Sequence, residues 1–168
     1  VDNSLKFLKS LGFSHLDDEK DNNIGIALGG LTNGATPLEM AAAYGAIAND
    51  GVYIEPTFYT KVVDGNGNTV FEPKQESRTV MSASAAYVVK EVLTQPVKSG
   101  TSTTLAMSGM SVAAKTGTTN NDYDRWMCGF TPYYSAAVWY GYDKSETVSG
   151  WSLSPAGQIW SGVMKPEI

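Results

Sequence analysis

Apolar residues at helical spacing mark both ends of the chain. In residues 3–11, leucine and phenylalanine recur every three or four positions, and Gly12 follows as a stop signal. The segment 153–164 is also apolar and helix-like, with Ser154 as a candidate N-cap and Pro155 in the first turn. We therefore predict one helix near each end of the chain.

Two further helices are predicted between these ends. The clearer one starts at Thr36-Pro37-Leu38-Glu39, where the threonine can cap the helix, proline suits the first position and the glutamate completes a capping box. It continues through an alanine-rich run, which indicates tight packing, and stops at Asn49-Asp50-Gly51. The other covers about residues 82–94, with Pro96 just beyond it. Its expected apolar face consists of Tyr87, Val88, Val89, Val92 and Leu93.

The remaining apolar stretches have the shorter, β-branched and aromatic character of strands. Segments 52–54, 58–63 and 69–72 are predicted strands, the last two joined as a hairpin by a turn rich in Gly, Asn and Asp. Three closely spaced strands are predicted at 111–118, 125–131 and 135–142, the last two close enough for an antiparallel hairpin. Helices before and after an antiparallel β-sheet predict an α+β fold.

Composition narrows the function classes. The 168 residues, 42% hydrophobic and 17% charged, are typical of one globular domain. The net charge of −5 and the scattered basic residues argue against a nucleic-acid partner or a membrane-surface patch. We also predict no membrane contact from this segment, because no apolar run approaches the roughly 18 residues that span a bilayer.

Cys128 is the only cysteine, so a disulfide framework is excluded. We expect it to be a small buried apolar residue. A cysteine nucleophile would need a base, and the only histidine, His15, lies in an acidic loop where we expect it to be solvated.

The candidate chemistry lies in the predicted strand that ends in Lys115-Thr116-Gly117-Thr118. Lys115 offers a cation, the two threonines offer hydroxyl groups to a substrate carboxylate, and Gly117 permits close approach of a ligand to the backbone. An exposed strand edge would let an extended peptide add as a further strand. Taken alone, the tripeptide Lys115-Thr116-Gly117 is a weak signal, since it also fits a strand that runs into a polar turn.

The polar loop 119–124 follows this strand directly. It lacks the alternating carboxylates and terminal glutamate of a dedicated calcium site. We predict that it forms the rim of a substrate cleft, with Thr119 and Asn121 touching the ligand. No metal and no cofactor are expected.

Three segments in order carry a family resemblance. They are Gly29-Gly30 through Asp50-Gly51, Gly100-Thr101 with Ala114 through Thr119, and Trp126 through Pro132 leading into Ala137 through Gly141. From about residue 1 to 164, the chain resembles the C-terminal half of the transpeptidase domain of class A (bifunctional) penicillin-binding proteins.

The resemblance implies part of an α/β/α domain of the penicillin-binding and serine β-lactamase type. It implies an acyl-transfer enzyme of peptidoglycan synthesis, in which a serine attacks the D-Ala-D-Ala bond of a stem peptide and β-lactams trap that serine. Lys115 and Thr118 would be catalytic, through the proton network and through a backbone N–H of the oxyanion hole. Residues 116–119 and Asn121 would bind substrate, with Thr116 and Thr118 holding its carboxylate.

The chain departs from the family in one respect: it contains neither Ser-x-x-Lys nor Ser-x-Asn. In the family both motifs precede this region, so we expect residues 1–168 to be the C-terminal portion of the domain, without a nucleophile and inactive alone. The resemblance places an upstream glycosyltransferase domain and membrane anchor in the parent protein, on the extracytoplasmic face of the bacterial membrane. Apolar surface left uncovered would favour a dimer.

Two alternatives remain open on the sequence. One is a fragment of a serine β-lactamase or DD-carboxypeptidase. The other is a noncatalytic extracellular binding module in which Lys-Thr-Gly-Thr is only a turn. Lys115 on an edge strand that faces a groove favours the enzyme family, and Lys115 on a solvent-facing loop tip favours the module.

Overall fold

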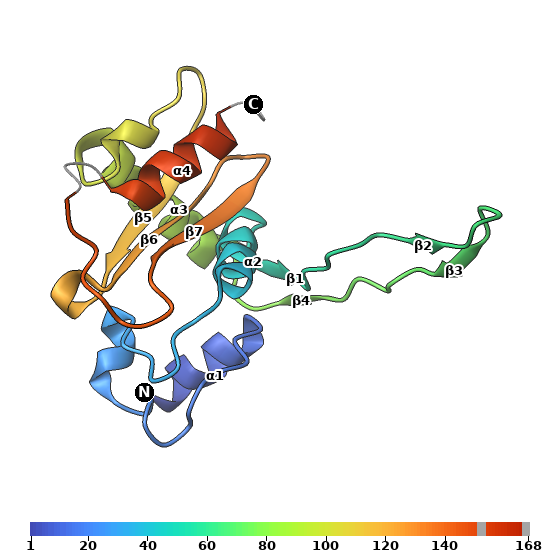
Figure 1. Cartoon of the computed structure of the whole chain (residues 1–168), viewed down its shortest axis with the longest axis horizontal. Helices are drawn as coiled ribbons and strands as arrows, with labels where there is room; N and C mark the ends of the chain where they lie inside the picture. The colour runs from blue at the N-terminus through green and yellow to red at the C-terminus, as the bar shows by residue number, and fades with distance from the viewer. Residues whose placement is uncertain (151–153, 166–168) are drawn as a thin grey trace.

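A three-stranded antiparallel β-sheet forms the centre of the computed structural model, which describes residues 1–150 and 154–165 (Figure 1). Its strands are β5 (Ala113–Thr118), β6 (Asp124–Phe130) and β7 (Ser135–Gly141), in that spatial order. The helices are α1 (Asp2–Ser10), α2 (Pro37–Ala48), α3 (Ala83–Ser99) and α4 (Pro155–Met164). Short 3-10 turns are η1 (Ile24–Leu28), η2 (Thr103–Leu105) and η3 (Asn120–Asp122). The predicted α+β fold is confirmed.

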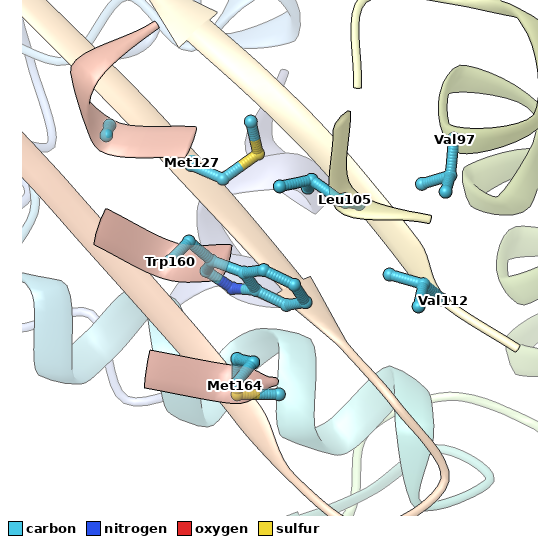
Figure 2. Close-up of a cluster of buried hydrophobic side chains, with 8 residues drawn as sticks. Val97, Leu105, Val112, Met127, Trp160 and Met164 are labelled. Carbon is cyan, nitrogen blue, oxygen red and sulfur yellow. The ribbon is translucent and has the colours of Figure 1, made fainter. Parts of the chain in front are cut away.

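One face of the sheet packs against α4. Strand alternation turns Ala114, Met127 and Val138 to this face, where they pack in one cluster with the fully buried Trp160. Figure 2 shows Met127 and Trp160 in this cluster. The Trp160 indole N–H donates to the Ala136 carbonyl, 3.1 Å away, so its polar atom is satisfied. The rest of this cluster is Val97, Leu105, Val112, Ala156 and Met164.

Helix α2 covers the opposite face of β6 and β7. Its small residues allow this approach: a Cβ on Gly45 would lie 3.7 Å from the Cβ of Ser135, and the Ser135 hydroxyl donates to the Ala41 carbonyl at 2.8 Å. The predicted start at Thr36 is confirmed by a capping box with Glu39. The tight packing expected from the alanine-rich run is therefore present.

Helix α3 differs from the prediction in its length and in its buried face. It runs through Pro96 to Ser99, and the Pro96 carbonyl accepts hydrogen bonds from two residues beyond the helix, which satisfies its last turn. The predicted apolar face is wrong, because the buried residues are Ala86, Thr94 and Val97. More than half of the surface of Tyr87, Val88 and Val92 is exposed. A helix that is apolar on two sides does not reveal in its sequence which side meets the sheet.

Residues 52–79 form an arm that projects from the body of the molecule (Figure 1). The predicted hairpin is confirmed in shorter form as β2 (Val62–Val63) and β3 (Thr69–Phe71). At the base of the arm, β1 (Val52–Ile54) pairs with β4 (Ser77–Thr79), a strand that the sequence pattern did not indicate. Tyr53 in β1 joins a second core cluster, whose other buried members are Leu11, Phe13, Ala43 and Ala46.

Glu39 joins the N-terminal segment to α2. Its carboxylate accepts hydrogen bonds from the backbone N–H groups of Ser14 (2.7 Å) and Thr36 (2.8 Å), and from both hydroxyls. Burial alone would raise the pKa of Glu39, but these hydrogen bonds outweigh it and lower the pKa to about 2. His15, expected to be solvated, is indeed half exposed, yet its Nδ1 lies 3.5 Å from Glu39 Oε1, a neighbour that the sequence did not suggest.

Replacing Glu39 with glutamine is expected to lower the free energy of unfolding by up to about 3 kcal/mol at neutral pH. Because the folded-state pKa is depressed from 4.5 to about 2, the stabilising contribution is complete above pH 4.5 and lost as the pH falls towards 2. The gap between wild type and Glu39→Gln should therefore close over that window in denaturant unfolding curves. Glu91→Gln, on the exposed side of α3, is the matched control. A gap that stays constant from pH 6 to pH 2 would contradict this account.

Candidate active site

The Lys-Thr-Gly-Thr segment is an edge strand. Among the described strands, β5 pairs only with β6, in a register that places Lys115 opposite Cys128 and Thr118 opposite Arg125. Just beyond the strand, the Thr119 N–H donates to the Asp124 carbonyl.

Hydrogen-bonded and non-hydrogen-bonded pairs alternate along an antiparallel ladder. Since Thr119 bonds to β6, the peptide groups of Gly117 and Lys115 also face β6, and those of Thr118 and Thr116 face the open edge. The Thr118 N–H therefore points outward, where a bound peptide could reach it.

Lys115 lies on this open edge. Its side chain is exposed, and its Nζ donates to the outward-facing carbonyl of Thr116 at 2.8 Å. The lysine is neither buried in the interior nor placed on a loop tip, so the edge-strand part of the expectation for the enzyme family is met.

Two hollows in the described part of the chain lie away from Lys115. Both are beside η2 and α4, and one, of about 370 Å³, is lined by Thr104, Gly157 and Ser161 among others. Lys115 itself is exposed.

The threonine hydroxyls differ in what they can still donate. Thr118 Oγ1 accepts from Arg125 Nη1 at 3.3 Å, and because a guanidinium only donates, the Thr118 hydroxyl hydrogen remains available to a carboxylate. Thr116 Oγ1 lies 3.2 Å from the hydroxyl of Thr101. Arg125 also pairs with Asp122 at 3.2 Å. Sequence analysis missed Arg125, although the antiparallel register of the predicted strands would have placed it opposite Thr118.

Packing within this chain favours glycine at position 117. A Cβ there would lie 3.1 Å from the Cβ of Trp126 on the neighbouring strand, tighter than ordinary contact. The glycine therefore admits the tryptophan as well as keeping the backbone open to a ligand.

The loop after β5 is held by its own hydrogen bonds. Thr119 Oγ1 donates to Asp124 Oδ2 and accepts from the Asp124 N–H, both at 2.9 Å. Its hydroxyl hydrogen is thus already used, and only one lone pair remains for a ligand. Asn121 and Asp122 adopt left-handed backbone angles, with φ of 62° and 58°. Ligand contact by Thr119 and Asn121 stays a prediction.

Cys128 lies on β6 opposite Lys115 and is only 2% exposed. Burial raises the pKa of its thiol to about 12, so it is held in the unreactive protonated form. The expected buried, apolar role is confirmed. Within residues 1–150 and 154–165, no group of three or more His, Cys, Asp or Glu side chains is placed to hold a metal ion.

The Cys128 thiol is expected to resist alkylation by iodoacetamide at pH 8 in the folded chain and to react fully in denaturant. The double variant Cys128→Ala with Ser145→Cys, whose new thiol lies on an exposed turn, should react in the folded state. Rapid alkylation of the native wild-type chain would show that the thiol is accessible and reactive. Mass spectrometry of intact protein measures both.

Known proteins are similar to this chain in sequence and structure. The model of the "Penicillin binding protein transpeptidase domain" family matches residues 7–165. Penicillin-binding protein 1A of Clostridium botulinum (strain Langeland) is 40% identical over 166 residues, which is 98% of this chain and 20% of that protein. The chain therefore spans about a fifth of the length of the curated relatives that it matches first.

Two solved structures share the arrangement of elements. PonA1 from Mycobacterium tuberculosis in complex with penicillin V has a TM-score of 0.80 at 27% identity, over 95% of this chain and 48% of that one. Penicillin-binding protein 1A from Haemophilus influenzae has a TM-score of 0.78 at 24% identity, over 96% of this chain and 30% of that one. The second likeness concerns the fold alone.

Proposed function

Because this chain belongs to the family of penicillin-binding protein transpeptidase domains, we propose that it supplies one wall of the active site of a peptidoglycan D,D-transpeptidase. The observation that supports this most directly is the edge strand β5, with Lys115 and the outward Thr118 N–H on its open side. The rest of the site, including the nucleophile, would come from a part of the protein that precedes these residues.

The proposed reaction has two steps. A serine Oγ forms a bond to the carbonyl carbon of D-Ala-D-Ala, the C–N bond to the terminal D-alanine breaks, and the serine proton ends on the departing amine. An amine of a second stem peptide then forms the new C–N bond as the acyl–serine bond breaks, and a proton returns to the serine. No serine in the 168 residues is followed three positions later by lysine, so the chain alone lacks this nucleophile.

Lys115 and Thr118 have separate roles in this proposal. The Thr118 N–H faces the position where the oxyanion develops, and one such donor lowers the barrier by roughly 3–4 kcal/mol in serine hydrolases. The Lys115 ammonium attracts the substrate carboxylate, an interaction of about 1 kcal/mol in water at 4 Å and about 4 kcal/mol near a protein surface. The Thr118 hydroxyl, with its hydrogen free, donates to the same carboxylate.

An extended substrate would run along the open edge of β5. The outward peptide groups of Thr116 and Thr118 offer it the pattern of one further antiparallel strand. Asn121 and Thr119 would border its carboxylate end, at the rim formed by the loop. β-Lactams would occupy the same position as mimics of the dipeptide.

The parent protein is proposed to act outside the cytoplasmic membrane, with an upstream anchor and glycosyltransferase domain. Its relatives are bacterial penicillin-binding proteins. In the described part of this chain, none of the helices is both long and apolar enough to span a bilayer.

The isolated chain is expected to bind no fluorescent penicillin covalently, whereas the intact transpeptidase domain that contains it should be labelled. The reason is the missing serine, without which no acyl-enzyme forms. Denaturing gel electrophoresis after incubation measures both. Covalent labelling of the isolated chain would contradict the division of the site, and an unlabelled intact domain would contradict the function.

In the intact domain, Thr118→Val is expected to weaken penicillin binding before acylation by about tenfold to a hundredfold. Valine keeps the backbone N–H but removes the hydroxyl that donates to the carboxylate, so the maximal acylation rate should change little. Thr118→Ser, which retains the hydroxyl, is the matched control. Stopped-flow acylation at increasing penicillin concentration separates the dissociation constant before acylation from the maximal acylation rate. An unchanged dissociation constant in Thr118→Val would contradict the assigned role.

The isolated chain is also expected to self-associate through α3. Tyr87, Val88 and Val92 leave an uncovered apolar stripe on this helix. The pair Val88→Glu and Val92→Lys, which can form an i,i+4 ion pair, should return the chain to its monomer mass of 18.0 kDa in sedimentation equilibrium. The same charges at Val62 and Val63, on the arm, are the control for the other exposed apolar surface. A wild-type chain that stays monomeric as concentration rises would contradict this expectation.

A further inference from the structure

Asp124 uses its carboxylate and its backbone to hold the residue that follows the Lys-Thr-Gly-Thr segment. Asp124 Oδ2 accepts from the Thr119 hydroxyl at 2.9 Å, and the Asp124 N–H donates to Thr119 Oγ1, also at 2.9 Å. The Asp124 carbonyl accepts from the Thr119 N–H at 3.3 Å. Three hydrogen bonds therefore fix Thr119 against the first residue of β6.

The second carboxylate oxygen of Asp124 extends this link across the sheet. Its Oδ1 accepts from the Trp139 indole N–H at 2.8 Å. Trp139 lies on β7, which β6 pairs along its whole length. The Thr119 side chain is thus anchored, through one carboxylate, to the partly buried Trp139 on β7.

Thr119 is followed directly by the turn that joins β5 to β6. Asn121 and Asp122 both adopt left-handed backbone angles, a conformation that asparagine and aspartate tolerate better than other residues with a side chain. Directly before this turn, β5 has a neighbouring strand on one side only among the described residues. Without Thr119 held in place, the last residues of the strand would fray.

Thr118 is the residue that such fraying would displace. It lies between Gly117, bonded to β6, and Thr119, bonded to Asp124, and its own N–H points to the open edge without a strand partner. The direction of that N–H therefore depends on both neighbours being held.

We propose that Asp124 is a positioning residue for the acylation step, one that aims the Thr118 N–H at the developing oxyanion through Thr119. This inference rests on the proposed transpeptidase function. The role is positioning because each carboxylate oxygen of Asp124 accepts from a side chain of this chain, Oδ2 from Thr119 and Oδ1 from Trp139.

Replacing Asp124 with asparagine in the intact transpeptidase domain tests the proposal. The amide has one acceptor oxygen, so with Trp139 bonded to it the Thr119 hydroxyl loses its acceptor, and the amide N–H can restore a contact only by donating to Thr119 Oγ1 in the reverse direction. The maximal acylation rate by penicillin should fall by about tenfold or more, because misdirecting an oxyanion donor raises the barrier. The dissociation constant for penicillin before acylation should change by less than the rate does, because the oxyanion contact is made only in the transition state, whereas the Lys115 contact lies farther from the end of the strand and remains.

Substitutions at Thr119 complete the test. Thr119→Val removes the hydroxyl that bonds to Asp124 and should reproduce the loss of maximal acylation rate, and Thr119→Ser, which retains that hydroxyl, should lose less. The double variant with Asp124→Asn and Thr119→Val should be no slower than the slower single variant, since both changes break the same link. Asp143→Asn, in an exposed turn, controls for loss of surface charge. A merely structural role would lower the melting temperature without this split between rate and affinity.

The outcomes are distinguishable. A maximal rate within about twofold of wild type in folded Asp124→Asn overturns the proposal, as does weakened binding with an unchanged rate. If Asp124→Asn does not fold, Thr119→Val decides by the same criteria. If the wild-type domain itself is not acylated, the proposed function fails, and the positioning role fails with it.

Discussion

The pairing of β5 with β6 is the constraint on which the candidate site depends. The antiparallel register from Ala113 opposite Phe130 to Thr118 opposite Arg125 determines which peptide groups face β6 and which face the open edge. A shift by one residue would turn the Thr118 N–H inward and exchange the two faces of the sheet. The buried Ala114 and Met127 oppose that shift, because it would move apolar side chains out of the core beneath α4.

The hydrogen bonds around β5 determine which threonine hydroxyls can still donate to a ligand. Arg125 donates to Thr118 and leaves that hydroxyl with a hydrogen to give, whereas Asp124 accepts the hydrogen of Thr119. Two neighbouring threonines of the same type therefore have different capacities, one suited to an anionic ligand and the other to holding the loop. This distinction comes from their partners on β6.

The chain leaves two kinds of surface exposed. Helices α2 and α4 enclose β6 and β7, yet the edge at Lys115 and the stripe on α3 are exposed. An apolar helix face and a strand edge with unpaired peptide groups are both surfaces that proteins normally cover. Their exposure agrees with a chain that spans about a fifth of its relatives, 20% in the first of them.

The sequence by itself determined the helix starts, the central strands and the family. The Thr36 capping box and the apolar strands are local patterns, and local patterns report local structure. The Lys-Thr-Gly-Thr strand and its flanking segments were enough to identify the family, which the family match over residues 7–165 confirms. Lys115 and residues 116–119 were singled out because their chemistry can be seen in a short motif, and their roles remain a proposal.

Only the tertiary structure decided which side of α3 is buried, that β4 pairs with β1, and that Arg125 and Asp124 reach the site. The β1–β4 pairing and the positions of Arg125 and Asp124 depend on contacts between residues that are separated in sequence. The buried side of α3 depends on a choice between two apolar faces of one helix. Hydrophobic periodicity cannot distinguish two apolar faces of one helix, and it carries no information about which strand lies beside another. Those choices follow from the free energy of packing the whole chain.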